Sequence, residues 1–323
     1  MRELLIGRND AGQRLDKFLT KSLYRLPISL MQKYLRTKKI KVNRARAQGN
    51  TMLKEGDTVQ LFIRDEFFER EEVSDSIYTT VPKLSVVYED ENIIVCDKRP
   101  GVLVHPDDSG EERNTLLLHI KAYLCRNGEY SPEEETSFAP ALCNRIDRNT
   151  GGMVIAAKNA EALREMNRII KENLISKFYL CAVHGSVKKK ADTLEGFLVK
   201  NSRDNLVTVS PTPFKGAKKI ITKYKKLSEK RELSLLEIEL VTGRTHQIRA
   251  HMSYIGHPLL GDGKYGINKN DRAKGYKYQA LYSYRLRFLN IDGPLAYLSG
   301  KEISVPFENI WFLKEFDMEK NVK

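Results

Sequence analysis

The sequence predicts an α+β protein in which a mixed, largely antiparallel central sheet with flanking helices follows a small α+β domain. From Leu84 onward, strand-like segments follow one another as hairpins with few helices between them, which favours this class over a doubly wound sheet. The sequence contains no Gly-rich phosphate loop and no dinucleotide-binding fingerprint. An acidic stretch separates the two regions. We therefore expect a first domain at 1–63, an acidic linker at 64–83 and a larger domain at 84–323.

The charge balance points to a polyanionic partner. The 323 residues include 55 Lys and Arg against 42 Asp and Glu, a net charge of +13, which favours RNA or DNA. No apolar run reaches the roughly 18 residues of a membrane helix, and the first residues are too short for a signal peptide. We expect a cytoplasmic monomer without membrane attachment.

Metal-binding patterns are missing from the sequence. The four cysteines are widely spaced and form no C-x-x-C pair. His246 and His251 are five residues apart and would face different sides of a helix, unlike the two histidines of a zinc helix. We expect no metal site.

The first domain reads as two short helices followed by strands. Apolar residues at helical spacing predict helices at 13–23 and 29–37, with Pro27 breaking the chain and Ser29 as the N-cap of the second. Strands are predicted at 40–43 and 58–63, with Gly-containing turns between them.

This domain carries a one-sided charge. Between positions 14 and 46 eleven basic residues face a single acidic one, Asp16. A charge run is usually a solvated face, but crowded like charges cost stability, and a polyanion that releases counterions compensates them. The expected RNA-binding residues are Arg14, Lys17, Lys33, Arg36, Lys38, Lys39, Lys41 and Arg44. Residues 14–19 (RLDKFL), the second helix leading into a strand, and the Gly56-Asp57 turn resemble the small S-four-like RNA-binding domain named after a small-subunit ribosomal protein.

The larger domain alternates hairpins and helices. Strands are expected at 85–88, 93–96, 102–106, 154–157, 177–183, 278–289 and 302–305, and hairpin-like segments at 193–210, 219–227 and 233–241. Helices are expected at 115–125, at 159–172 with Asn159 as N-cap, at 245–254 and at 307–316, and a surface loop at 126–137.

One turn stands out chemically. In residues 144–152 (NRIDRNTGG) the carboxylate of Asp147 lies between Arg145 and Arg148 along the chain. A neighbouring cation keeps a carboxylate ionised, and an anionic Asp beside Arg groups suits nucleophilic chemistry on RNA. Taken alone, such a turn is more often a salt-bridged surface turn.

Other motifs change that balance. Residues 144–152, 177–185 (KFYLCAVHG) and 241–252 (VTGRTHQIRAHM), with KRPG at 98–101 and GHPLLGD at 256–262, resemble in order and approximate spacing the motifs of the RluA-type (RluC/RluD-like) pseudouridine synthases. The resemblance implies the pseudouridine synthase fold for 84–323. It also implies isomerisation of uridine to pseudouridine in a structured RNA, with no metal or cofactor.

The resemblance assigns roles to individual residues. It makes Asp147 the nucleophile, Tyr179 an active-site tyrosine against the target ring and a candidate for proton transfer, and Arg249 the partner of the catalytic Asp. Because side chains alternate along a strand, Tyr179 should face a pocket while Phe178 and Leu180 face the core. Attack on the base and chemistry at the sugar both remain open.

Further residues are expected to bind substrate. The resemblance implies that Arg145 helps to displace the target nucleotide, an extrusion that costs a few kcal/mol. Arg148, Arg244 and His246 are the other candidates, with phosphate contact or structural hydrogen bonding favoured over catalysis for the last two. The sequence departs from the family pattern with Asn144 in place of His, and with Gly151-Gly152 in place of Ser-Gly.

We expect a synthase acting on large-subunit ribosomal RNA. Transfer RNA is the alternative substrate. A non-catalytic RNA-binding or ribosome-assembly factor on the same scaffold is the alternative function.

Overall fold

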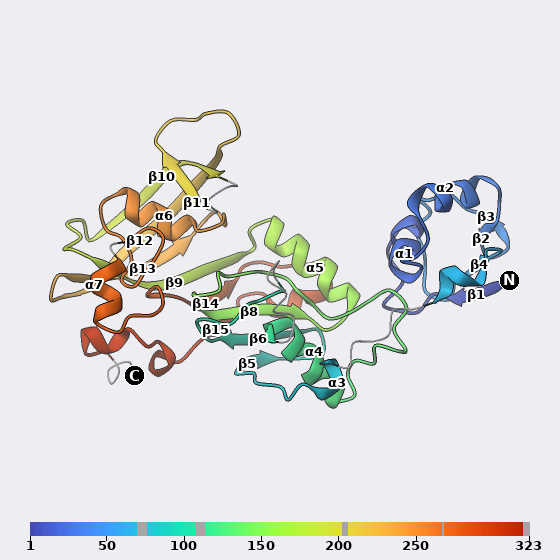
Figure 1. Ribbon diagram of the computed structural model, residues 1–323, viewed down its shortest axis with the longest axis horizontal. Helices are drawn as coiled ribbons and strands as arrows, with labels where there is room; N and C mark the ends of the chain where they lie inside the picture. Colours follow the sequence, from blue (N-terminus) through green and yellow to red (C-terminus); the bar gives the residue numbers. More distant parts are fainter. Residues whose placement is uncertain (70–75, 107–113, 202–205, 267, 319–323) are drawn as a thin grey trace.

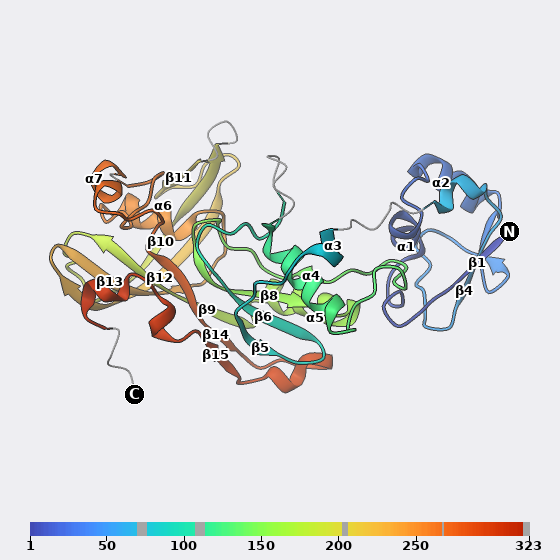
Figure 2. The same cartoon turned by 60° about the horizontal axis from the view of Figure 1, so that its bottom comes forward.

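The computed structural model describes residues 1–69, 76–106, 114–201, 206–266 and 268–318, arranged around two separate sheets. In Figures 1 and 2 the small N-terminal unit, in blue, lies at one end of the molecule and the larger unit fills the rest. The first sheet has four strands in the order β1-β4-β2-β3, and the second has eleven strands.

The first unit is built from two helices and four short strands. They are β1 (Arg2–Leu5), α1 (Leu15–Ser22), α2 (Ile28–Arg36), β2 (Ile40–Val42), β3 (Ala45–Arg46) and β4 (Thr58–Leu61). Phe18 of α1 and Leu35 of α2 belong to a buried apolar cluster that this unit does not share with the larger one. Burying such a side chain contributes about 1.5–3 kcal/mol, so this cluster holds the unit together. The two helix predictions are confirmed to within two residues.

The start of α2 and the hairpin after it differ from the sequence expectation. Pro27 occupies the N-cap position, and Ser29 lies inside the helix without a capping role. The turn between β2 and β3 consists of Asn43 and Arg44, whose φ angles are 50° and 65°. Positive φ at both positions is the geometry of a two-residue hairpin turn, normally signalled by glycine. Because Asn43 and Arg44 occupy these positions in place of glycine, the sequence does not predict this hairpin.

The acidic stretch forms two short helical turns, of which the first contacts the first unit and the second packs against α4 (Leu116–Arg126) of the larger unit. A 3₁₀ turn η1 covers Asp65–Phe68 and a short helix α3 covers Ser76–Thr79. Asp65 contacts Arg2, and Glu69 contacts Arg25. Of the expected linker residues, Glu71, Glu72 and Asp75 lie outside the described residues.

The large sheet is mixed and almost entirely antiparallel, as the sequence predicts. Its main path runs β11-β10-β12-β13-β9-β14-β8-β6-β5, with β15 paired to β14 and β7 paired to β8. Among the described strands only the β14/β8 pair is parallel. The strands are β5 (Val86–Glu89), β6 (Ile93–Lys98), β7 (Ala141–Leu142), β8 (Gly151–Ala157), β9 (Ile175–His184), β10 (Ala191–Asn201), β11 (Leu206–Ser210), β12 (Lys218–Lys230), β13 (Leu233–Leu240), β14 (Leu281–Phe288) and β15 (Glu302–Ser304).

Helices cover both faces of this sheet. They are α4 (Leu116–Arg126), α5 (Ala160–Lys171), α6 (Gln247–Tyr254) and α7 (Asn268–Ala273), and the side chains of Thr115 and Asn159 cap α4 and α5. The apolar face of α5 packs in one core cluster, and those of α4 and α6 pack in the other. Alternate residues of β6 and β8 enter the two clusters, so both strands are buried along their whole length.

Two expected elements are wrong. Residues 102–106 form no strand and make only an isolated bridge between Leu103 and Thr115, because the preceding turn is tied to the Asp147 turn. Residues 307–316 form two 3₁₀ turns, η4 (Phe307–Asn309) and η5 (Leu313–Phe316). Ile310 leaves the helical region at φ −93° and ψ 92°, which separates them. A further 3₁₀ segment, η3 (Gly293–Leu298), was not expected.

None of the helices in the described ranges has the length and apolar composition that a membrane span requires.

Candidate active site

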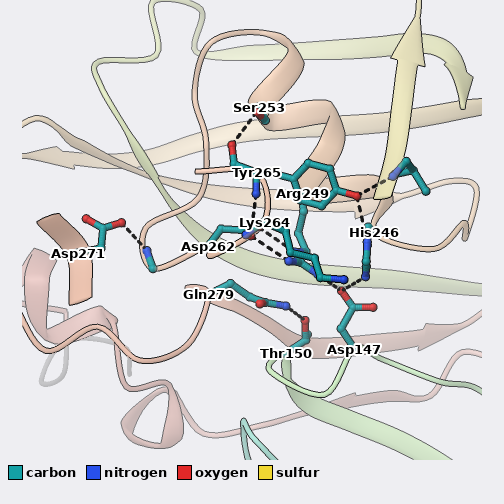
Figure 3. Close-up of polar contacts among 12 residues, drawn as sticks. Asp147, Thr150, His246, Arg249, Ser253, Asp262, Lys264, Tyr265, Asp271 and Gln279 are labelled. Atoms are coloured by element: carbon teal, nitrogen blue, oxygen red, sulfur yellow. Dashed lines mark hydrogen bonds and ion pairs between the residues drawn. The ribbon is translucent and has the colours of Figure 1, made fainter. Parts of the chain in front are cut away.

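Asp147 lies in the turn between β7 and β8, and its neighbours fix that turn. Asn144 accepts a hydrogen bond from the backbone N–H of Ile155 at 2.8 Å, and Thr150 N–H donates to the Asp147 carbonyl at 3.0 Å. The buried side chain of Gln279 donates to the Thr150 hydroxyl at 2.9 Å (Figure 3). Asn144, where the family pattern has His, therefore anchors the turn to β8.

The cation beside Asp147 is Arg249 of α6. Its Nη1 donates to Asp147 Oδ2 at 2.8 Å, and the Asp147 side chain is 26% exposed. This contact is the pairing that the family resemblance implied, whereas the expectation that Arg145 and Arg148, its neighbours along the chain, also flank the carboxylate is wrong. Arg145 is exposed, and Arg148 donates from Nε to the Gly101 carbonyl at 3.1 Å. Adjacent residues of a turn point in different directions, so neighbours in sequence are not neighbours in space.

Asp262 holds Arg249 in place. Arg249 Nε donates to Asp262 Oδ2 at 2.7 Å and Nη2 donates to Oδ1 at 2.9 Å, a two-point contact in which the Asp262 side chain is fully buried. Burial alone would raise the pKa of Asp262, but the hydrogen bonds and charge of Arg249 bring it below its usual value. Burial likewise opposes the charge of Arg249, and its two carboxylates raise its pKa overall. The third nitrogen, Nη1, is left to contact Asp147.

His246 lies on the other side of Asp147. It precedes α6 with a left-handed backbone at φ 53°, and its Nε2 is 3.8 Å from Asp147 Oδ2. Its Nδ1 is 3.0 Å from the hydroxyl of Tyr265, which also accepts a hydrogen bond from Val207 N–H. Burial lowers the pKa of His246, although Asp147 acts in the opposite direction, so the imidazole is neutral near pH 7.

Tyr179 lines the same cavity from β9. It lies on the strand face opposite Phe178 and Leu180, which pack in the other core, so the alternation predicted from sequence is confirmed. Burial raises the pKa of Tyr179 to about 12, with a hydrogen bond to Ser283 acting against the shift. The phenol is therefore protonated at neutral pH.

These side chains surround one cavity of about 580 Å³, within the range of nucleotide-sized sites. Of the site residues expected from sequence, the cavity is lined by Arg145, Asp147, Tyr179, Arg244, His246 and Arg249. Arg148 is not part of its wall. Arg145 and Arg244 are exposed, whereas Arg249 is buried.

Lys98 stabilises the Asp147 turn through three hydrogen bonds. Its buried Nζ donates to the carbonyls of Arg99, Val102 and Arg148 at 3.1, 3.0 and 2.9 Å. Burial lowers the pKa of Lys98 to about 7, against the opposite effect of Asp147. The KRPG motif thus supports the Asp147 turn.

The roles of Lys98, Asp262 and Tyr265 were not predicted from sequence. A signal for Asp262 is present, because it ends the GHPLLGD motif 13 residues after Arg249, and an arginine buried in a core needs carboxylates.

The Gly151-Gly152 pair is also explained. A Cβ on Gly151 would lie 2.4 Å from the Tyr282 ring, and one on Gly152 would lie 2.1 Å from the Ser283 carbonyl oxygen. Where β8 runs parallel to β14, a side chain at Gly152 would collide with backbone, and one at Gly151 would require the Tyr282 ring to move.

Comparison with known proteins identifies the family of this chain. Residues 92–254 match the family model described as RNA pseudouridylate synthase. An uncharacterized RNA pseudouridine synthase of Mycoplasma genitalium is 34% identical over 296 residues, 90% of each chain. The ribosomal large subunit pseudouridine synthase C of Vibrio cholerae is 32% identical, covering 88% of this chain and 85% of that protein.

A solved structure shares the fold. Human RNA Pseudouridylate Synthase Domain Containing 1 superposes with a TM-score of 0.55 at 23% identity, over 73% of this chain and 86% of that one. The chain belongs to the RluA family of RNA pseudouridine synthases, isomerases that act on RNA.

Proposed function

We propose that this protein converts specific uridines of large-subunit ribosomal RNA to pseudouridine, with Asp147 as the nucleophile. The observation that carries the proposal is the Asp147–Arg249 ion pair at the wall of a nucleotide-sized cavity that also contains Tyr179. Similarity to proteins named ribosomal large subunit pseudouridine synthase C supports the choice of RNA.

The geometry suits Asp147 to that role. At about 4 Å and an effective dielectric near 20, a charge pair is worth about 4 kcal/mol before desolvation, enough for Arg249 to hold the carboxylate ionised and oriented. Both polar contacts of Asp147 use Oδ2, which leaves Oδ1 without a hydrogen-bond partner among the described residues. Figure 3 shows this second oxygen directed away from Arg249.

The remaining groups have distinct tasks. The reaction breaks the N1–C1′ bond, forms a C5–C1′ bond and releases the hydrogen from C5. The protonated phenol of Tyr179 lies against the pyrimidine and serves proton transfer. Arg145 and Arg244, exposed at the cavity, and the neutral His246 bind the substrate strand, while Arg148 acts by ordering the turn.

Residues 1–63 serve as the S-four-like RNA-binding domain, and 84–323 as the catalytic domain. Seven of the eight expected RNA-binding residues are exposed, and Lys41 is partly buried. Arg14 is paired with Asp16 at 2.6 Å and offers RNA less charge than sequence suggests.

Pseudouridine mapping at single-nucleotide resolution tests the proposal. Ribosomal and transfer RNA would be compared from cells with the gene, without it, and with Asp147→Asn. We expect the same uridines of large-subunit ribosomal RNA to lose modification in the deletion and the variant. Loss of pseudouridine from transfer RNA alone would identify transfer RNA as the substrate instead. Full modification of the same uridines with Asp147→Asn would show that Asp147 is not the nucleophile.

A further inference from the structure

Lys177 shares the cavity wall with Tyr179 and has no assigned role. The two residues are two positions apart on β9, so their side chains leave the same face of the strand, and both line the cavity. Lys177 is partly buried. Within the described ranges, its ammonium group forms no hydrogen bond and no ion pair.

The other basic groups around the cavity do not share this situation. Arg249 is held by two carboxylates, and Lys98 by three carbonyls. Arg145 and Arg244 are exposed to solvent. Lys177 is thus a cation taken partly out of water with nothing in the described chain to compensate it, an arrangement that costs free energy unless a ligand supplies the counter-charge.

Burial alone accounts for the lowered pKa of Lys177, with no contribution from a neighbouring charge. The pKa of Lys98, by contrast, is raised by Asp147. Asp147 thus shifts the pKa of Lys98 but not that of Lys177.

Resting on the proposed function, we propose that Lys177 binds a phosphate of the RNA strand that carries the target uridine. The uracil ring is neutral, and the fixed anions of a nucleotide are its phosphates. Two residues along a strand span roughly 7 Å, which separates the Lys177 backbone position from that of Tyr179 and suits the RNA backbone rather than the base. A lysine ammonium is a compact point charge that binds phosphate without demanding a planar, two-point contact.

Steady-state kinetics on a large-subunit ribosomal RNA transcript labelled with [5-³H]uridine test this assignment, because isomerisation releases tritium from C5. Lys177→Met keeps the length of the side chain and removes its charge, and Lys177→Arg keeps the charge. Lys188→Met, at an exposed position outside the cavity, is the matched control.

Removing a charged hydrogen bond weakens binding about tenfold or more, so Lys177→Met should raise KM about tenfold and change kcat less than threefold. The slope of log KM against log salt should fall by about 0.7, the value for one phosphate on a single strand. Lys177→Arg and Lys188→Met should stay within about threefold of the unaltered protein.

Two results would overturn the proposal. An unchanged KM and salt slope in Lys177→Met would show that no phosphate is bound there. A loss of kcat with unchanged KM would place the ammonium at the reacting base instead. Circular dichroism melts confirm folding, and Lys177→Gln replaces the Met variant if that one unfolds.

RNAs in which a single backbone phosphate has been made neutral give a second, independent measurement of this contact. Once the modified uridine is mapped, short RNAs carrying a single methylphosphonate on either side of it remove one phosphate charge at a time. One such substitution should weaken binding to the unaltered enzyme and leave Lys177→Met unaffected, since that variant has no ammonium to pair with the phosphate. Additive losses at every phosphate would contradict the assignment.

The same assays separate this inference from the proposed function. An unaltered protein that releases no tritium from ribosomal or transfer RNA would reject both. An active protein whose Lys177→Met variant is indistinguishable from it would reject the role of Lys177 alone.

Discussion

Arg249 and Asp262 form a buried two-point ion pair, with Nε–Oδ2 at 2.7 Å and Nη2–Oδ1 at 2.9 Å, and this pair aims the remaining nitrogen of Arg249 at Asp147. A guanidinium has a rigid planar fork, so fixing two of its nitrogens fixes the direction of the third. The orientation of Asp147 therefore depends on a carboxylate that need not touch the substrate.

Replacing Asp262 by Asn should lower kcat about 10- to 100-fold with a small change in KM, because Arg249 loses its fixed direction. Removing one partner of a buried pair is also costly, and we expect a loss of about 2–4 kcal/mol in the free energy of unfolding. Tritium release and urea unfolding would measure the two effects. Asp317→Asn, in the exposed pair with Lys230, is the control and should change stability by less than about 1 kcal/mol. Normal kcat in Asp262→Asn would show that Arg249 keeps its orientation without this carboxylate.

Gly152→Ala should be more destabilising than Gly151→Ala. The added Cβ at Gly152 would lie 2.1 Å from the Ser283 backbone. The new alanine would also have to keep φ at +108°, which residues with a Cβ rarely adopt. At Gly151 it meets only the side chain of Tyr282. We expect a loss of about 3 kcal/mol or more for Gly152→Ala and about 1–3 kcal/mol for Gly151→Ala, measured by urea unfolding. Shortening Tyr282 to Leu should recover part of the second loss and none of the first. Equal, small losses would contradict the packing described here.

His251 should make the protein less stable in acid. It is buried on α6 with Nδ1 3.0 Å from the Thr222 hydroxyl, and burial lowers its pKa to about 4 from the usual 6.5. Between these values the unfolded chain binds the proton and the folded chain does not, so the stabilisation is complete above pH 6.5 and is lost as the pH falls toward 4. The free energy of unfolding should fall between pH 7 and pH 4.5 in the unaltered protein. In His251→Asn this fall should be smaller by about 2 kcal/mol. The same pH dependence in both proteins would mean that His251 is not the titrating group.

The basic hairpin region of the first unit should control salt-dependent RNA affinity. Lys38, Lys39 and Arg44 are exposed at the end of α2 and around the β2–β3 turn. In the full-length protein, changing these three residues to Gln should weaken RNA binding and lower the salt slope by about 2–3, at roughly 0.7–0.9 for each phosphate that is no longer bound. Filter binding over a range of salt would measure it. The control changes Lys219, Lys223 and Lys225 of β12 to Gln and should leave the slope near its original value. An unchanged slope in the first variant would remove these residues from the RNA interface.

Local signals were read correctly from sequence. The helix α5 and its cap Asn159, the β5–β6 hairpin, and the alternation that turns Tyr179 toward a cavity all depend on residues within a few positions of each other. The β2–β3 turn was not predicted, because Arg44 adopts a positive φ that is normally associated with glycine. The single helix predicted at 307–316 was wrong, because a helical spacing of apolar residues does not show that the backbone leaves the helical region at Ile310.

The sequence by itself determined the family motifs, the mixed and largely antiparallel sheet, and the choice of Asp147, Tyr179 and Arg249 as the groups to which we propose to assign the chemistry. The family resemblance also paired Arg249 with Asp147, 102 residues away, and the structure contains that contact. Only the tertiary structure decided how the contact is built and that the adjacent Arg145 and Arg148 point elsewhere. An ion pair forms where the packing of α6 against the β7–β8 turn brings two side chains within about 3 Å, a long-range result that no short stretch of sequence encodes. The same packing placed Asp262 behind Arg249 and left Lys177 on the cavity wall without a partner among the described residues.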